Sequence, residues 1–288
     1  MTRRDLLYAN RLSILLLLMF CATLALGQRK PKSINPLEGF LDTQFWLGLK
    51  IGGNVTQAFP ETRFAGFSPI DYSPDSLEKS YSDFSLPGAH MGLEMNFYHR
   101  GFSVSFQPAY KRSRFEYSSQ TSWRGALINN RFDSRFDVEQ RLDVIELPLI
   151  IKYEIIQSGK IRPFVMAGGY HSRIASAQKE VRVTNTDFSS GRPLSSDGGA
   201  TIIGVKDAFQ PFSGVSGGIG VNLDYWNIRT VLEIQYQRGL TSATKPNVQE
   251  NQFASLGEIT DEVLLREINI SLGFVFPFRF IDKQFAAY

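Results

Sequence analysis

Apolar and polar residues alternate along most of this chain, and this two-residue period constrains its fold more than any other feature. The clearest example is near the C-terminal end, where Ile270, Leu272 and Phe274 occupy every second position. Successive side chains of a β-strand point to opposite faces, so the pattern predicts strands with one apolar face. Eight segments share it, each longer than the ~5–6 residues typical of soluble strands: 45–58, 86–98, 102–117, 140–156, 162–178, 209–223, 228–240 and 263–278.

The connections between these segments alternate strictly between long and short. Long connections cover about 59–85, 118–139, 179–208 and 241–262, whereas the short ones are 98–101, 157–161 and 224–227. In an up-and-down meander, this order places all long loops at one end. The sequence therefore predicts an all-β fold, an eight-stranded antiparallel up-and-down transmembrane β-barrel with four long outer loops and three short periplasmic turns.

The size of the side chains indicates which face meets lipid. Segment 228–240 sets Leu232 and Ile234 against Arg229 and Glu233. An eight-stranded barrel has an interior only just wide enough for side chains to fill. Eight rows of bulky residues do not fit there, so we expect the bulky face to meet lipid and the small or charged face to line the lumen. A secreted, lipocalin-like barrel with an apolar cavity is the alternative.

Aromatic residues flank the first short turn, where Phe97, Tyr98 and Phe102 follow one another closely. Amphipathic rings favour the boundary between lipid and water. These three residues are therefore predicted to form part of an aromatic girdle on the periplasmic side.

The N-terminus has the layout of a secretory signal peptide. Arg3, Arg4 and Arg11 precede the apolar run 12–26, which is shorter than the ~20 residues that an uncleaved membrane anchor needs. The expected division is a signal peptide at 1–27, a periplasmic segment at 28–44, the outer-membrane barrel at 45–280 and a periplasmic tail at 281–288.

Composition excludes several chemistries from the mature chain. Cys21 is the only cysteine and lies in the leader, so disulfides and thiol catalysis are not expected. Without Arg3, Arg4, Arg11 and Asp5, the 31 basic and 28 acidic residues become 28 and 27, a net charge of +1. Such a balance gives no indication of nucleic acid as a partner.

Charged residues recur at positions predicted to face the lumen. A buried charge without a partner is costly, so we interpret them as a network of ion pairs that packs the lumen. The predicted network contains Lys50, Glu94, Glu146, Lys152, Arg229, Glu233 and Glu267, and the same face includes Lys111, Glu154 and Arg173.

The sequence is also compatible with two other functions. A barrel enzyme would need a histidine beside a serine and a carboxylate. His90 and His171 are predicted to face inward, but no such cluster is visible, so neither enzymatic activity nor a metal or other cofactor is expected. The second long loop mixes arginine with aromatic residues, which are favoured at binding interfaces: Trp123, Arg124, Arg131, Phe132, Arg135 and Phe136.

Two neighbouring stretches resemble a known family. LDVIELPLIIKYEI (142–155) and IRPFVMAGGY (161–170) are similar to the signature of PorT-like outer-membrane β-barrel proteins of Bacteroidota-type bacteria, and 47–56 resembles the opening strand of that family. The resemblance implies the outer membrane of a Gram-negative bacterium. Its founding member acts in protein secretion, which is a possibility here by analogy only. Pro148 and Pro163 predict local bulges.

The last strand also resembles the C-terminal signal by which such barrels are recognised for insertion. Ser271, Gly273, Phe276 and Phe278 are the candidate residues, although Arg279–Tyr288 follow where that signal usually ends the chain. The expected partners are the outer-membrane lipid bilayer, the barrel-insertion machinery and other envelope proteins.

These observations together predict a non-enzymatic, integral outer-membrane barrel that acts in surface binding or envelope structure. The alternatives are a component of a secretion apparatus of the outer membrane and a lipid- or peptide-processing barrel enzyme.

Overall fold

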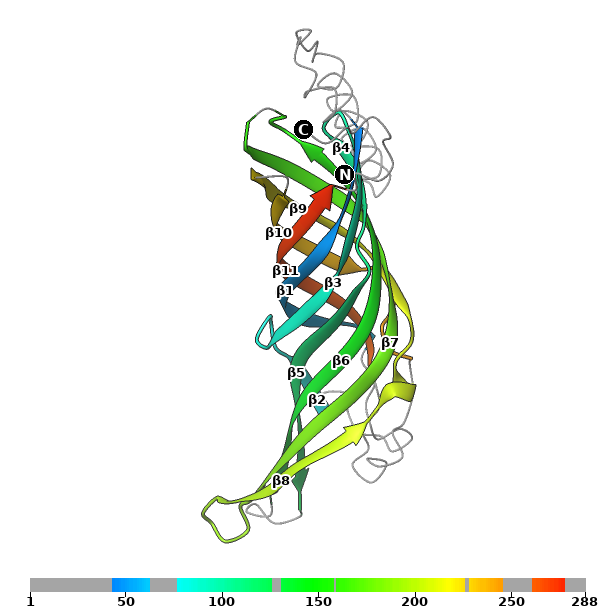
Figure 1. Cartoon of the computed structure of the whole chain (residues 1–288). Helices are drawn as coiled ribbons and strands as arrows, with labels where there is room; N and C mark the ends of the chain where they lie inside the picture. The colour runs from blue at the N-terminus through cyan, green and yellow to red at the C-terminus, as the bar shows by residue number, and fades with distance from the viewer. Residues whose placement is uncertain are drawn as a thin grey trace, which may run out of the picture. The chain divides into compact units, whose positions relative to one another are not determined.

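The computed structural model describes residues 43–62, 77–125, 131–157, 159–225, 228–245 and 261–277. In this part of the chain no helix has the length and apolarity needed to cross a bilayer. The described elements are β1 (Thr43–Thr62), β2 (Leu77–Tyr81), β3 (Pro87–His99), β4 (Phe102–Phe106), β5 (Ala109–Arg124), β6 (Arg131–Glu154), β7 (Ile161–Asp187), β8 (Leu194–Gly204), the short 3-10 helix η2 (Lys206–Ala208), β9 (Phe212–Tyr225), β10 (Ile228–Gly239) and β11 (Glu262–Pro277) (Figure 1).

Eight strands close into a ring by antiparallel pairing, with β4 and β5 counted as one interrupted strand. Their order is β1, β3, β4 with β5, β6, β7, β9, β10 and β11, and β11 pairs back onto β1. The eight-stranded antiparallel barrel predicted from the sequence is thereby confirmed. The first short turn is the two-residue pair Arg100 and Gly101, both with positive φ, as tight hairpins between right-twisted strands require.

The register fixes the stagger of the barrel. A row of paired residues that starts at Gln57 returns to β1 at Leu47, ten residues earlier, so the shear is ten. The strand number and the shear together set the tilt and the width of a barrel. The row runs Gln57, Arg266, Arg238, Val215, Gly169, Leu149, Phe106, Met95 and Leu47.

The outward face of the ring carries a belt of large apolar side chains. Along β10 exposed and buried residues alternate, with Leu232 and Ile234 outside and Arg229 and Glu233 inside, as predicted. The other exposed members of the belt include Leu47, Leu49, Ile51, Met91, Leu93, Phe97, Phe102, Val104, Phe106, Ile145, Leu147, Leu149, Ile151, Val165, Val215, Ile219, Ile270, Phe274 and Phe276. Tyr98 departs from the predicted girdle, because it is buried in the lumen.

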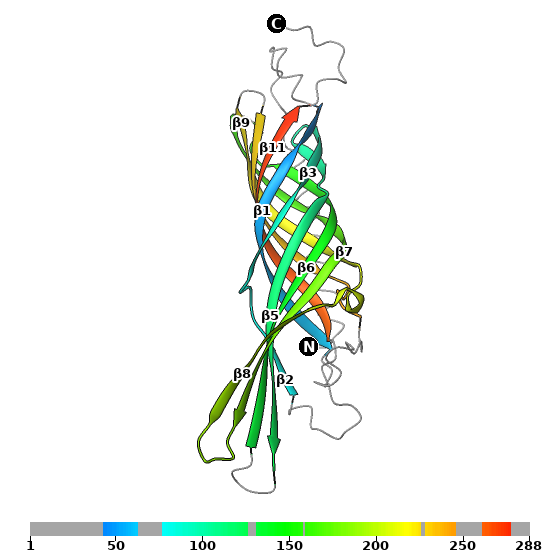
Figure 2. The same cartoon turned by 60° about the horizontal axis from the view of Figure 1, so that its bottom comes forward.

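Several strands continue well beyond the belt at the loop end, which corrects two predicted loops. The ranges 118–139 and 179–208 are largely strand: β5 and β6 pair as far as Arg124 and Arg131, and β7 and β8 pair as far as Asp187 and Leu194. Short β2 extends this sheet along β5. We call β2, β8 and the loop-side ends of β5, β6 and β7 the projecting sheet (Figure 2).

A bulge changes which residues face inward near the base of the projecting sheet. The register between β6 and β7 shifts between the pairs Asp143–Ser176 and Val144–Ile174, which leaves Ala175 of β7 as the extra residue. Below it Ser172 is buried, which turns its neighbours His171 and Arg173 outward. The predicted inward orientation of these two residues was therefore wrong.

The prolines do not cause register shifts, contrary to prediction. Pro148 pairs with Tyr170, and Pro163 pairs with Val221, both in continuous register. Pro148 lies opposite Gln107, whose backbone N–H donates a hydrogen bond to the Pro148 carbonyl oxygen at 3.1 Å. Proline has no N–H to return this bond. The break between β4 and β5 falls at this point, and the register on both sides of the break is the same.

Three lumen glycines of β9 lie directly opposite bulky residues of β7. Tyr170 pairs with Gly214, Met166 with Gly218, and Phe164 with Gly220. A Cβ on Gly220 would lie 2.3 Å from the Phe164 ring and 2.6 Å from the Leu232 carbonyl oxygen. The large side chains therefore occupy the space that the glycines leave.

We predict that Gly220→Leu impairs folding, whereas Gly217→Leu on the same strand is tolerated. Gly217 faces outward, and a Cβ there would meet its nearest atom at 3.8 Å. Overpacking a filled interior costs about 1–3 kcal/mol or more. Heat-modifiable migration in gels measures the folded fraction of each variant after refolding into detergent. Equal folded fractions for the two variants would contradict the packing described here.

Candidate functional site

The centre of the lumen holds a group of four charged side chains from four different strands. Lys152 on β6 contacts Glu94 and Glu233, both at 2.5 Å. Lys50 on β1 also pairs with Glu233 and donates to Gln107 at 2.9 Å. All four side chains are buried, and their charges sum to zero.

A second group lies nearer the loop end and centres on Lys111 of β5. Its ammonium contacts Glu146 at 2.8 Å and Glu267 at 2.6 Å, and it donates to Gln237 at 2.6 Å. Ser113 donates a further hydrogen bond to Glu267 at 2.7 Å. This group carries one more carboxylate than cations, and it uses neutral donors to satisfy the remaining oxygens.

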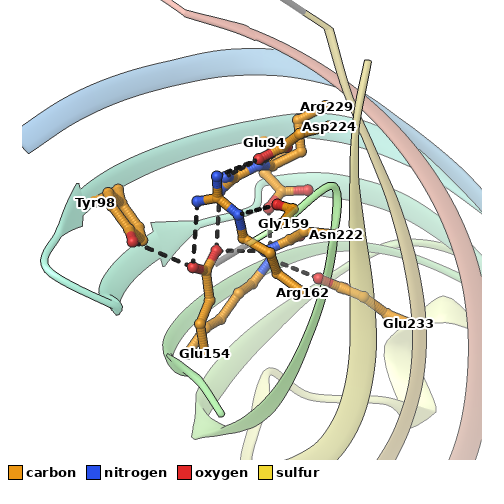
Figure 3. Close-up of polar contacts among 10 residues, drawn as sticks. Glu94, Tyr98, Glu154, Gly159, Arg162, Asn222, Asp224, Arg229 and Glu233 are labelled. Atoms are coloured by element: carbon orange, nitrogen blue, oxygen red, sulfur yellow. Dashed lines mark hydrogen bonds and ion pairs between the residues drawn. The ribbon is translucent and has the colours of Figure 1, made fainter. Parts of the chain in front are cut away.

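A third group closes the lumen near the short turns (Figure 3). Arg229 of β10 binds Asp224 through two nitrogens, at 2.6 and 2.8 Å, and lies 3.3 Å from Glu154. Arg162 contacts the same two acids, Asp224 at 3.3 Å and Glu154 at 3.7 Å. The Arg229 guanidinium also stacks over the ring of Trp46 at 4.6 Å, a favourable cation–π geometry.

The structure places all seven residues of the predicted network in the lumen, and it distributes them over these three groups. Arg173 does not join them, since it faces outward. Sequence reasoning missed Arg162, Asp224 and the Tyr98 hydroxyl, which donates to Glu154 at 3.2 Å. The position of Arg162, two residues before inward-facing Phe164, is the sequence signal that would have found it.

Two clusters of apolar residues pack the lumen together with the charged groups. The turn-side cluster consists of Trp46, Tyr98, Ile150, Phe164, Met166, Val231 and Val275. The loop-side cluster is larger and includes Phe115, Leu142, Val144, Tyr170, Phe209, Phe212, Val263 and Leu265. The second cluster is partly covered by the segment after β8, where η2 leads into a bridge between Phe209 and Thr244.

The histidines do not assemble a catalytic site among the described residues. His90 Nε2 lies 2.9 Å from Ser271 Oγ, and His171 Nδ1 lies 2.9 Å from Ser213 Oγ, but neither ring has a carboxylate on its second nitrogen. The cavity beside His90 measures about 20 Å³, close to the space of one water molecule. The described part of the chain also lacks a group of three or more potential metal ligands.

The candidate insertion signal lies on β11 with the expected alternation. Ser271 is buried, Gly273 approaches the Glu94 carboxylate, and Phe276 is exposed on the belt. Phe278 lies outside the described residues. Recognition of this strand for insertion stays a prediction.

The tip of the projecting sheet carries exposed aromatic and apolar side chains in one row. Trp123 lies opposite Phe132, and Asp187 pairs with both Phe132 and Leu194. Trp123 is 58% exposed and Leu194 is 65% exposed, although both lie on ordered strands. Beside this row, a hydrogen bond from Arg131 lowers the pKa of Asp133 below its usual value.

A closed barrel with an apolar outer belt and a charged, packed lumen defines an integral β-barrel membrane protein. Residues 36–245 match the family model described as the outer membrane protein beta-barrel domain, so the chain belongs to that family. It is a protein of the outer membrane of a Gram-negative bacterium. Among curated proteins, no sequence matches it.

Several solved outer-membrane proteins are similar in fold. Neisserial surface protein A has 12% identity and a TM-score of 0.35, over 81% of this chain and 97% of its own. OprG from Pseudomonas aeruginosa has 11% identity and a TM-score of 0.38, over 82% and 96%. The protease OmpT from Escherichia coli has 10% identity and a TM-score of 0.36, over the same shares. Similarity at this level carries no functional argument.

We predict that Lys152→Met strongly destabilises the barrel, because it leaves Glu94 unpaired and removes one of the two cations on Glu233. Breaking a buried ion pair in this way costs about 3–5 kcal/mol. The double variant Lys152→Met with Glu94→Gln should regain part of the loss, since Glu233 keeps Lys50. Urea unfolding followed by tryptophan fluorescence measures the midpoints.

The matched control is Arg135→Met, which breaks the exposed pair between Arg135 and Asp137 on the projecting sheet. Exposed pairs contribute about 0–1 kcal/mol. A loss from Lys152→Met no larger than that of the control would show that the central group does not support the fold.

Proposed function

We propose that this protein is a non-enzymatic outer-membrane protein that binds a macromolecule at the cell surface through the tip of its projecting sheet. The main support is the exposed row of Trp123, Phe132 and Leu194, held on strands rather than on a loop. Aromatic residues and arginine dominate the binding energy of protein interfaces. Rigid presentation also lowers the entropy that binding costs.

The distribution of charge at the tip favours a ligand that is recognised by shape and stacking. Arg131 and Arg135 are paired with Asp133 and Asp137 on the same strand. These two arginines of the tip are thus partly neutralised, which lowers their long-range attraction for an anionic ligand. Apolar contact with Trp123 and its neighbours is then the main source of affinity.

The filled lumen supports the same proposal. Three charged groups and two apolar clusters occupy the described interior, and the cavity beside His90 is about 20 Å³. Sites for drug-sized ligands typically measure about 300–1,000 Å³. The surface of the projecting sheet is therefore a better candidate for a binding site than the interior.

We predict that a photoreactive aromatic amino acid in place of Trp123 forms a specific adduct on intact cells. The same probe in place of Leu232, which faces lipid, is the control. Phe132→Ala with Leu194→Ala should weaken the adduct at position 123 about 30-fold, because an aromatic anchor contributes about 2 kcal/mol. Mass spectrometry identifies the attached molecule. Equal labelling from positions 123 and 232 would refute binding at the tip.

A role in secretion is the second candidate, and the similarity of 142–170 to PorT-like proteins supports it. The fold does not distinguish this role from the first. Affinity purification of the full chain from native membranes in mild detergent separates the two. Stoichiometric recovery of a multiprotein export assembly would favour secretion, whereas recovery of the barrel without one would count against it.

A further inference from the structure

Two arginines lie directly opposite each other on the outer surface of the barrel. Arg238 of β10 pairs in register with Arg266 of β11, and both side chains face away from the lumen. Like charges at directly opposed positions of an antiparallel pair repel each other. Arg266 is held in place by Phe59, whose ring centroid lies 4.2 Å from its guanidinium carbon. The structure thus concentrates two positive charges at one place.

Neither of these guanidiniums has an acidic partner within the described part of the chain, unlike two other outward arginines of the barrel. On the opposite side of the ring, Arg112 contacts Asp143 at 2.7 Å and Arg114 contacts Glu139 at 2.7 Å. Two described acids on the same side of the ring accept hydrogen bonds from neutral groups instead.

One of these acids is on β11 itself, and the other lies between β2 and β3. Glu262 accepts a hydrogen bond from Thr62 at 3.2 Å, and Asp83 accepts one from Gln57, which is next to Arg266 in the row. Among the described residues no carboxylate forms an ion pair with either arginine, which leaves both guanidiniums available to an external anion.

The position of the pair indicates what kind of anion reaches it. The outward residues next toward the membrane centre are Tyr236 and Ile268, then Ile234 and Ile270, all members of the apolar face. Tyr236 is 44% exposed, and tyrosine favours the boundary between hydrocarbon and headgroups. The arginines thus interrupt the apolar face on the side of the long loops, where exposed Leu240 and Phe59 lie beyond them. The tyrosine beneath them is the observation that places them near the headgroups of the outer leaflet.

We propose that Arg238 and Arg266 bind the phosphate group of an acylated lipid of the outer leaflet, with its chains lying along the apolar face beneath them. A guanidinium presents N–H donors in a fork that matches phosphate oxygens. Two opposed guanidiniums share one dianionic group better than a monoanion. The ligand is therefore a lipid whose headgroup bears a phosphate monoester, and the proposal does not depend on the function assigned to the tip.

The test uses the purified full chain in a zwitterionic detergent, with added lipid A that carries both phosphates as the probe. We expect the probe to raise the unfolding temperature of the wild-type barrel. Arg238→Gln with Arg266→Gln should weaken the apparent affinity at least about tenfold, because charge-assisted hydrogen bonds to phosphate are lost. The control is Arg135→Gln with Arg182→Gln, which removes the same charge from exposed positions on the projecting sheet.

Two further arms identify the recognised chemistry. Dephosphorylated lipid A tests the phosphate, and inorganic phosphate at equal concentration tests whether the acyl chains are needed. The proposal predicts little stabilisation from either. It is overturned if the variant binds the probe as wild type does, if the control variant loses binding equally, or if either of these two molecules stabilises the barrel as well as the probe does.

Discussion

The pairing of β1 with β11 is the interaction on which the rest of the structure depends. Within a bilayer no water satisfies a free strand edge, and each unpaired backbone group costs several kcal/mol. The sixteen-residue register between these two strands removes that edge. Closure also fixes the number of strands and the shear, and these two quantities set the width of the lumen. The backbone alone therefore determines the volume that is available to the inward side chains.

A lumen of fixed width makes the interior a packing problem that this sequence solves in two ways. Where β7 and β9 meet, bulky residues lie against glycines, as Phe164 does against Gly220. Elsewhere long charged side chains reach across the ring, as Lys152 does to Glu233. Each lysine of the first two charged groups contacts at least one carboxylate, which offsets the cost of removing its charge from water. Glycine and lysine thus serve the same end on different strands.

Much of this arrangement was predictable where the two faces of a strand differ strongly. Along β10, Arg229 and Glu233 alternate with aliphatic residues, so both the lumen network and the lipid belt follow from the sequence. Prediction failed on β7, where large apolar residues occupy both faces and give no contrast: Phe164 is inside and Val165 is outside. The bulge at Ala175 then exchanges the inward and outward positions along β7, and no residue type in the sequence indicates it.

The projecting sheet escaped prediction for a related reason. Outside the bilayer no face of a strand needs to be apolar. The serine, arginine and aspartate residues of β5 and β6 therefore have the composition of a loop, although the two strands stay paired as far as Arg124 and Arg131. Continuity has a mechanical consequence. Because β5, β6 and β7 run from the barrel wall into the projecting sheet without interruption, the barrel fixes the position of the tip. A site there is set by the same hydrogen bonds that hold the barrel closed, whereas one in a flexible loop would have to be ordered on binding.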